Sequence, residues 1–174
     1  MKHITLIIIA MLFSITAFAQ QTFDTDFTQT KTMKVSGKTT DKVGHIVFDG
    51  KDQLKMTYTK PDGDYFIIEG NMVKINMDGK KADLDANKVK MVGLQRSTLL
   101  NCLSGNWEQA AADNNAETTI TEEKGEKVIS LNAKGKVPKG GYRSVVLTYR
   151  PSNGGLVKMV LEEAAGIINT YEIK

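Results

Sequence analysis

The chain has 174 residues, of which 41% are hydrophobic, and its 23 Lys and Arg against 20 Asp and Glu give a formal charge of +3. So small a surplus predicts neither a nucleic-acid partner nor electrostatic attachment to a membrane surface. The single cysteine, Cys102, excludes an internal disulfide, and its apolar neighbours favour a small buried side chain over a reactive thiol.

The N-terminus has the features of a secretory signal peptide. Lys2 precedes the apolar run Ile4–Phe13, and Ala17–Ala19 places small residues at both positions that determine cleavage. The apolar run is too short to span a bilayer. We therefore expect residues 1–19 to be removed and residues 20–174 to form a single domain that is soluble outside the cytoplasm.

The first part of the mature chain has the pattern of antiparallel strands. From Phe23 to Val35 apolar residues alternate with Thr and Lys, which predicts a first strand, and a polar turn is expected over Gly37–Lys42. Between Gly44 and Lys80 the alternation continues, and Gly, Asp and Asn interrupt it at each turn of a meander. The residues predicted to share one apolar face of this meander are Ile46, Phe48, Leu54, Met56 and Tyr58.

The spacing of apolar residues becomes helical between Asn87 and Ala112. The predicted apolar stripe consists of Val89, Val92, Leu99, Leu103 and Trp107. Gly105 is expected to divide the region into two short helices, and Asn106 is expected to cap the second. Strands return at Ala116, so that about ten or eleven strands surround one helical insert, which favours a large curved sheet or barrel.

No pattern of residues predicts catalysis or a bound metal. His45 is the only histidine after the signal peptide, and no second histidine, cysteine or carboxylate lies at ligand spacing from it in the sequence. Neither a nucleophile elbow nor a phosphate-binding loop is present. The sequence therefore predicts a binding protein without cofactor or metal rather than an enzyme.

Six methionines follow the signal peptide, most of them on expected strands. They are Met33, Met56, Met72, Met77, Met91 and Met159. Methionine is unbranched and polarizable, so that it adapts to partners of varied shape. Two interpretations remain open: the methionines fill the core, or they line a flexible apolar concavity on a sheet that one helical insert covers incompletely.

Five short motifs occur in order along the chain. They are Phe27-Thr28-Gln29, Gly44–Phe48, the strand Leu54–Pro61 with its Tyr-x-x-Pro ending, Phe66–Gly70 and the closing Tyr171–Ile173. Their order and spacing resemble those of LolA-like periplasmic carriers of outer-membrane lipoproteins. The resemblance implies a mainly β fold, an unclosed antiparallel half-barrel of about ten or eleven strands, with short helices as a lid over a hydrophobic cavity.

The resemblance also implies a function. Members of that family shield the acyl chains of a lipoprotein released at the inner membrane and ferry it across the periplasm to an outer-membrane acceptor. For this chain it implies a monomeric periplasmic carrier, whose partners are an acylated lipoprotein or lipid, an inner-membrane release complex and an outer-membrane acceptor. Shielding acyl chains requires apolar area, at about 0.8 kcal/mol per buried methylene, and no catalyst.

The cavity that the resemblance implies is expected to bind lipid. The residues expected to line it are Ile46, Phe48, Leu54, Met56, Tyr58, Phe66, Ile68, Val73, Ile75, Met77, Leu99, Leu103 and Trp107. The chain departs from the better-studied members in two places. Phe23 follows the cleavage site with no helix between, and Gly50 stands where those members have an Arg, followed by Pro, that holds the lid. The alternative function is a regulatory module on the same fold that senses a lipid or lipoprotein.

Overall fold

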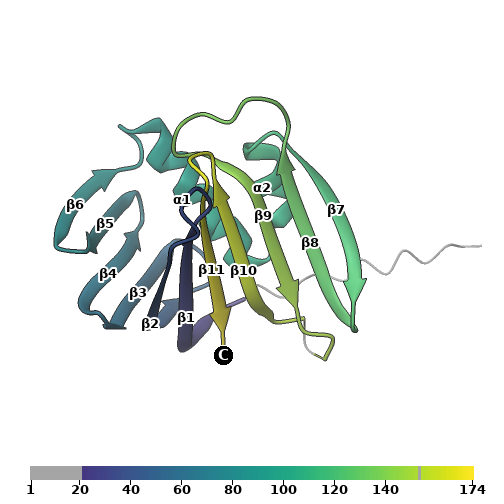
Figure 1. The fold of residues 1–174 in the computed structure, drawn as a ribbon, viewed down its shortest axis with the longest axis horizontal. Coiled ribbons are helices and arrows are strands. Elements are labelled where there is room, and N and C mark those ends of the chain that lie inside the picture. Colours follow the sequence, from purple (N-terminus) through teal and green to yellow (C-terminus); the bar gives the residue numbers. More distant parts are fainter. Residues whose placement is uncertain (1–20, 153) are drawn as a thin grey trace, which may run out of the picture.

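The computed structural model describes residues 21–152 and 154–174, so that the expected signal peptide lies outside the described residues. Eleven strands form one antiparallel sheet, and two helices are inserted between the sixth and seventh strands (Figure 1). The strands are β1 (Phe23–Met33), β2 (Thr39–Phe48), β3 (Gln53–Lys60), β4 (Asp62–Glu69), β5 (Met72–Met77), β6 (Lys80–Asp85), β7 (Ala116–Glu123), β8 (Glu126–Ala133), β9 (Tyr142–Tyr149), β10 (Leu156–Glu163) and β11 (Ile167–Ile173). The helices are α1 (Lys90–Ser104) and α2 (Trp107–Asp113).

Two meanders meet at the centre of the sheet, whose strand order is β6-β5-β4-β3-β2-β1-β11-β10-β9-β8-β7. The first strand pairs with the last, which sets Phe27 opposite Ile173 and Gln29 opposite Tyr171. The outermost strands β6 and β7 each have a neighbour on one side only, so the sheet is not closed. The unclosed half-barrel with a helical insert that the sequence predicted is therefore confirmed.

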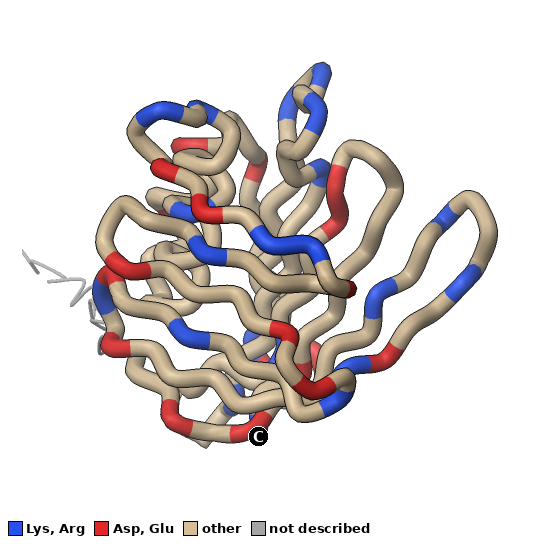
Figure 2. The backbone as a smooth tube through the Cα atoms, turned by 90° about the vertical axis from the view of Figure 1, so that its left-hand side faces the viewer, with Lys and Arg blue, Asp and Glu red and all other residues tan. Residues whose placement is uncertain are grey.

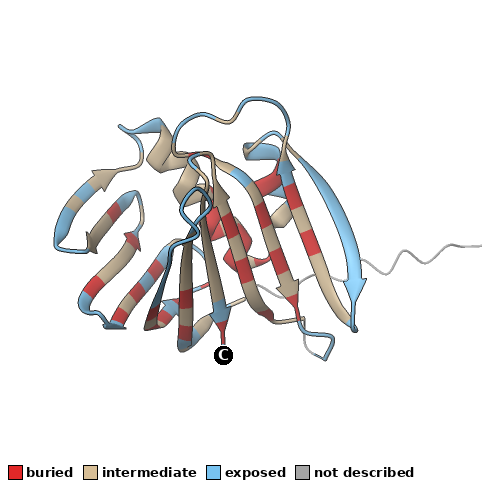
Figure 3. Ribbon diagram, in the orientation of Figure 1, coloured by how far each residue is buried: buried red, intermediate tan, exposed pale blue. Residues whose placement is uncertain are grey.

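The predicted apolar face of the first meander is also confirmed. Ile46 pairs with Met56, and Phe48 pairs with Leu54. These four side chains and Tyr58 are at most 3% exposed. Buried and less buried residues alternate along β2 and β3, as expected for strands with one face toward the core (Figure 3). The polar turn before β2 is shorter than predicted, because β2 begins at Thr39.

Gly44 in β2 creates the space for an aromatic ring at the centre of this face. A Cβ atom at Gly44 would lie 2.8 Å from the ring of Phe27 and 2.4 Å from the carbonyl oxygen of Thr57. Phe27 is fully buried and meets the ring of Tyr58 edge-on, with 5.3 Å between the ring centroids. Only a glycine lets β2 and Phe27 approach this closely.

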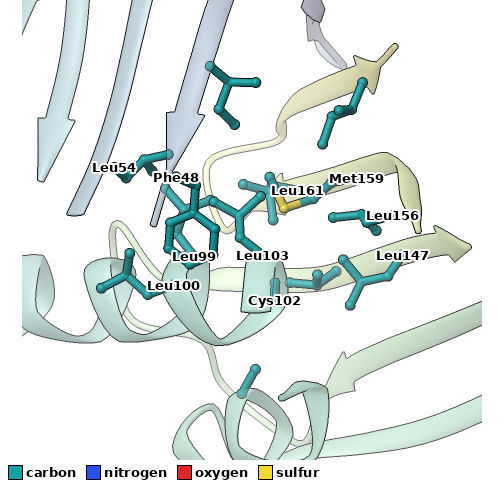
Figure 4. Close-up of a cluster of buried hydrophobic side chains, with 14 of the residues drawn as sticks. Phe48, Leu54, Leu99, Leu100, Cys102, Leu103, Leu147, Leu156, Met159 and Leu161 are labelled. Atoms are coloured by element: carbon teal, nitrogen blue, oxygen red, sulfur yellow. The ribbon is translucent and has the colours of Figure 1, made fainter. Parts of the chain in front are cut away.

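The two helices pack on the concave face of the sheet. Leu99, Leu100, Cys102 and Leu103 of α1 are buried among strand residues such as Met159 and Leu161 (Figure 4). Neither helix has a side-chain hydrogen bond at its N-cap. Because short helices are only marginally stable alone, contacts with the sheet hold α1 and α2 in place. No helix in the described part of the chain is long and apolar enough to cross a membrane.

The helical region differs from the prediction in two details. Gly105 ends α1 with a left-handed φ of 82°, as expected. Asn106 precedes α2, but its side chain does not cap that helix and instead donates to the side chain of Asn101. Val89 is 41% exposed and does not belong to the apolar stripe. It still lies in the turn after β6, where its N–H donates to the carbonyl oxygen of Asp85.

The methionines do not mark a single apolar face. Met56 and Met159 are buried in the core, whereas Met33 is 45% and Met72 is 37% exposed. Met33 ends β1 and Met72 begins β5, so both lie where the strands run into turns. The six methionines therefore do not share one environment, and each of the two interpretations applies to only some of them.

The outer face and the edges of the sheet are charged. Lysine and arginine are interspersed with aspartate and glutamate over the face formed by β2 to β6 (Figure 2). The edge strand β7 is exposed along almost its whole length and consists mainly of Thr and Glu, and the other edge strand, β6, carries two Lys and two Asp. Charged edge strands oppose pairing with the sheet of another molecule.

Candidate functional site

A cavity of about 190 Å³ lies between α1 and the concave face of the sheet. It is lined by Met56, Tyr58, Phe66, Val73, Ile75, Met77, Leu84, Val92, Gln95, Arg96, Leu99, Tyr142, Leu161, Glu163, Asn169 and Tyr171. Strands β3 to β6 contribute an almost entirely apolar wall, and α1 forms the roof. Strands β9 to β11 contribute a wall in which four of five residues are polar.

Cross-strand pairing builds the apolar wall. Met56 of β3 pairs with Phe66 of β4, which pairs with Ile75 of β5. A second row runs parallel to the first through Leu54, Ile68, Val73 and Leu84. The two rows place large apolar side chains side by side, and such cross-strand contacts stabilise the sheet while they shape its surface.

The residues predicted to line a lipid cavity fall into two groups. The first group lines the observed cavity and consists of Met56, Tyr58, Phe66, Val73, Ile75, Met77 and Leu99. The second group forms or packs on the closed core and consists of Ile46, Phe48, Leu54, Ile68, Leu103 and Trp107. One helix explains the division: Leu99 of α1 borders the cavity, whereas Leu103, one turn later, is fully buried.

The polar wall of the cavity was not predicted from the sequence. Tyr58 donates to Oε1 of Gln29 at 2.7 Å, and Nε2 of Gln29 donates to Oδ1 of Asn169 at 3.0 Å. Nδ2 of Asn169 in turn donates to Oε1 of Glu163 at 3.1 Å. Strand alternation could have revealed the inward position of Glu163. Residues two apart on a strand face the same side, and Glu163 lies two residues after the inward-facing Leu161. A carboxylate at such a position requires a partner or a function.

Two tyrosines of the polar wall line the cavity together with Glu163. Burial raises the pKa of Tyr142 and of Tyr171 above its ordinary value, and the negative charge of Glu163 raises both further. Both hydroxyls therefore remain protonated at neutral pH and can act as hydrogen-bond donors. Neither has a hydrogen-bond partner within the described residues.

Two adjacent side chains attach the roof to opposite halves of the sheet. Nε of Arg96 donates to the carbonyl oxygen of Gly70, in the turn between β4 and β5, at 2.6 Å. Nε2 of Gln95 donates to the carbonyl oxygen of Gly140, in the loop between β8 and β9, also at 2.6 Å. Helix α1 thus bridges the two meanders above the cavity.

A buried ion pair lies beside the cavity. Lys42 and Asp64 are each 7% exposed, and Nζ of Lys42 is 2.7 Å from Oδ2 of Asp64 and 3.1 Å from Oδ1 of Asp78. Burial alone would lower the pKa of Lys42, but hydrogen bonds to the two carboxylates outweigh it and raise that pKa. Lys42 is therefore charged and already neutralised, so it is not available to attract an anionic ligand.

His45 lies on the outer face, where β1 supplies two partners that the sequence did not predict. Nδ1 of His45 is 2.9 Å from Oδ1 of Asp26, and Nε2 is 2.9 Å from Oδ1 of Asp24. Hydrogen bonds to Asp26 and Asp24 raise the pKa of His45. Spacing in the sequence could not reveal these partners, because it is strand pairing that sets Asp26 opposite His45. Even so, the described residues contain no group of side chains able to hold a metal ion.

Among solved structures, the fold is similar to a LolA superfamily protein from Nitrosomonas europaea, with 11% identity over 90% of this chain and 86% of that chain and a TM-score of 0.40. It is also similar to the lipoprotein LppX of Mycobacterium tuberculosis, with 11% identity over 87% of this chain and 85% of that chain and a TM-score of 0.34. A third similar structure is the MucA/MucB complex of Pseudomonas aeruginosa, with 11% identity over 89% of this chain and 51% of that chain and a TM-score of 0.38. No curated protein matches the sequence.

Comparison with protein families gives a match that spans nearly the whole chain. Residues 19–174 match the family described as outer membrane lipoprotein carrier protein LolA. The match includes every strand of the half-barrel and both helices. The chain therefore belongs to the LolA family.

Proposed function

We propose that this protein is a periplasmic carrier, which shields the acyl chains of a lipoprotein in the cavity and moves the lipoprotein from the inner to the outer membrane. The observation that supports this most directly is the apolar wall of β3 to β6, which lies beneath helix α1, whose N-cap has no side-chain hydrogen bond. Membership of the LolA family supports lipoprotein as the cargo. The predicted signal peptide supports the periplasm as its location.

We infer that the roof moves when an acyl chain binds, because the cavity is small for such a chain. At about 30 Å³ for each group of the size of a water molecule, a cavity of about 190 Å³ holds roughly six methylenes, which is less than a full-length acyl chain. A chain enters only if α1 moves away from the apolar wall. Burying each methylene of the ligand contributes about 0.8 kcal/mol toward replacing the lost contacts of α1. The difference in the ligand's affinity for the closed and open states sets the fraction of molecules in which α1 has moved.

The two groups of predicted residues then act at different stages. The group that lines the cavity is expected to contact the acyl chain first, and the group now in the closed core is expected to contact it after α1 has moved. An inner-membrane release complex and an outer-membrane acceptor would deliver and receive the cargo. The protein itself is expected to act as a monomer, and as a binding protein rather than a catalyst.

Filling the cavity tests this function. In Ile75→Trp the indole occupies the space between β5 and α1, because Ile75 lines the cavity. Displacement of an environment-sensitive dye by a triacylated lipopeptide is expected to require at least about tenfold more peptide than for the unmodified protein, since about 1.4 kcal/mol of lost contact corresponds to a factor of ten. Circular dichroism checks that the variant remains folded despite the larger side chain.

The matched control is Val47→Trp. Val47 is 41% exposed on the neighbouring outer face, so the same substitution adds an indole without touching the cavity. It is expected to leave displacement unchanged. Equal displacement in the two folded variants, or no binding of lipopeptide to the unmodified protein, would refute the proposed function.

A further inference from the structure

The cavity has two chemically different walls. Of the residues that β3 to β6 contribute, Tyr58 alone has a polar group, and its hydroxyl is already bonded to Gln29. The opposite wall carries a carboxylate, an amide and two phenol hydroxyls from Glu163, Asn169, Tyr142 and Tyr171. A purely hydrocarbon ligand would leave this second wall desolvated and unpaired, which is unfavourable. The cavity therefore fits an amphiphile whose polar group faces β9 to β11.

The polar wall offers both kinds of hydrogen-bonding group. Glu163 accepts one hydrogen bond, from Asn169 to its Oε1, while its Oε2 has no partner within the described residues. Tyr142 and Tyr171 line the same cavity as this carboxylate, and their hydroxyls are donors that no other described residue engages. A ligand group that donates one hydrogen bond and accepts another can satisfy both, and a secondary amide does so with its N–H and its carbonyl oxygen.

The charge of the polar wall disfavours an anionic group. Glu163 is the carboxylate that lines the cavity, and the cation that lines it, Arg96, is bound to Gly70 in the turn after β4. Four strands separate β4 from β10, so Arg96 lies toward the other side of the half-barrel. Inside a protein, two like charges repel each other more strongly than in water. A carboxylate or phosphate placed against β10 would therefore be repelled.

We propose that the polar wall recognises an uncharged acyl amide, whose N–H donates to Glu163 and whose carbonyl oxygen accepts a hydrogen bond from Tyr171 or Tyr142. This inference rests on the proposed function and deepens it, because it names the linkage that distinguishes the cargo. The acyl chain lies along β3 to β6, and its amide lies on β9 to β11. Fatty-acid anions, which offer no donor and carry a like charge, are rejected by the same residues.

Three lauroyl compounds with the same chain test the proposal. N-methyl lauramide carries a donor and an acceptor, methyl laurate carries acceptors only, and laurate carries a negative charge. Displacement of a dye from the cavity, below the concentration at which each compound forms micelles, gives their affinities. The unmodified protein is expected to bind the amide about tenfold more tightly than the ester, because a site built to bond an N–H discriminates against an analogue that lacks it. Laurate is expected to bind most weakly.

Substitution of the carboxylate separates charge from shape. Glu163→Gln keeps an acceptor but removes the charge, and it is expected to reduce the gap between amide and laurate by about tenfold. The matched control is Glu162→Gln, because Glu162 is paired with Lys34 at 2.7 Å and does not line the cavity. This control is expected to leave the order of affinities unchanged.

The outcomes distinguish this inference from the carrier function. Equal binding of the three compounds by the unmodified protein overturns the amide site and leaves the carrier function intact. An unchanged gap in a folded Glu163→Gln variant also overturns it. Binding of none of the three overturns both. The order of affinities on the unmodified protein is decisive without any variant, so the amide site remains testable even if the Glu163→Gln chain fails to fold.

Discussion

Lys42 and Asp64 show that strand pairing determines whether a buried charged residue has a partner of opposite charge. Each lies on an inward-facing position of its strand, and they come from β2 and β4, on either side of β3. Their 2.7 Å contact is almost completely shielded from water. Taking two charges out of water is costly, and their mutual attraction repays the cost only while both are present.

Removing one member of this pair should destabilise the protein strongly. Lys42→Met is expected to lower the free energy of unfolding by about 3–5 kcal/mol, because it leaves Asp64 buried without its partner. The double variant with Asp64→Leu should recover most of that loss. Urea denaturation of the single and double variants gives the coupling between the two residues.

The control for this pair is another lysine with a short contact. Nζ of Lys74 lies 2.6 Å from Glu69, but both side chains are more than one third exposed. Lys74→Met is therefore expected to change stability by less than about 1 kcal/mol. Similar losses in Lys42→Met and Lys74→Met would show that burial does not determine the strength of the first pair.

Single residues also show where prediction from sequence succeeds. Alternation alone placed Leu54, Met56 and Tyr58 on the core face, since the period of a strand is a local property. The partners of Lys42 and Gln29 could not be identified in the same way. They depend on which strands are neighbours, and the β1–β11 pairing joins residues about 140 positions apart. The apolar half of the cavity was therefore predictable and the polar half was not.

In the proposed function, ligand entry depends on helix α1. Its apolar spacing predicted a helix, but the first turn could not be placed from sequence because no capping side chain marks it. Gly93 allows the helix to approach the turn after β6, since a Cβ there would lie 2.8 Å from the carbonyl oxygen of Ala86. Beyond apolar packing, the hydrogen bonds of Arg96 and Gln95 fix its position over the sheet.

Breaking one of these hydrogen bonds should loosen α1 selectively. Arg96→Leu keeps an apolar stem but removes the donor to Gly70, and it is expected to cost about 1–3 kcal/mol. Amide hydrogen exchange should become faster in residues 90–104 while the central strands remain protected, because local opening needs less free energy than unfolding. Hydrogen–deuterium exchange with mass spectrometry measures the difference.

An exposed arginine supplies the control for Arg96. Arg143 contacts Glu162 at 3.7 Å on the outer face, where its side chain is 60% exposed. Arg143→Leu is expected to leave the exchange of α1 unchanged. If Arg96→Leu and Arg143→Leu have the same effect on exchange, the bond to Gly70 does not hold the helix.

At the scale of the whole molecule, the protein should contain two units of different stability. The sheet is continuous from β6 to β7 through backbone hydrogen bonds, whereas α1 and α2 join it mainly through side chains. The reactivity of Cys102 measures how readily the helices separate from the sheet. It is fully buried on α1, and burial raises the pKa of its thiol to about 12.

Labelling of Cys102 should therefore reveal how easily the helices separate from the sheet. A thiol reagent should react slowly and through a local opening, whose free energy is smaller than that of global unfolding. The reference is the exchange of the Leu147 amide in β9, which requires the sheet itself to open. Identical opening free energies for Cys102 and Leu147 would mean that the helices and the sheet unfold as one unit.

The unpaired edges of the sheet affect the volume that the half-barrel can enclose. In a closed barrel the number of strands and their stagger fix the circumference, so the interior has one diameter. Here the wall ends at β6 and β7 without meeting. These two strands lie at opposite ends of the strand order, so strand pairing does not fix the distance between them. For the carrier function proposed above, we therefore expect one open sheet of eleven strands to accommodate acyl chains of different length and number.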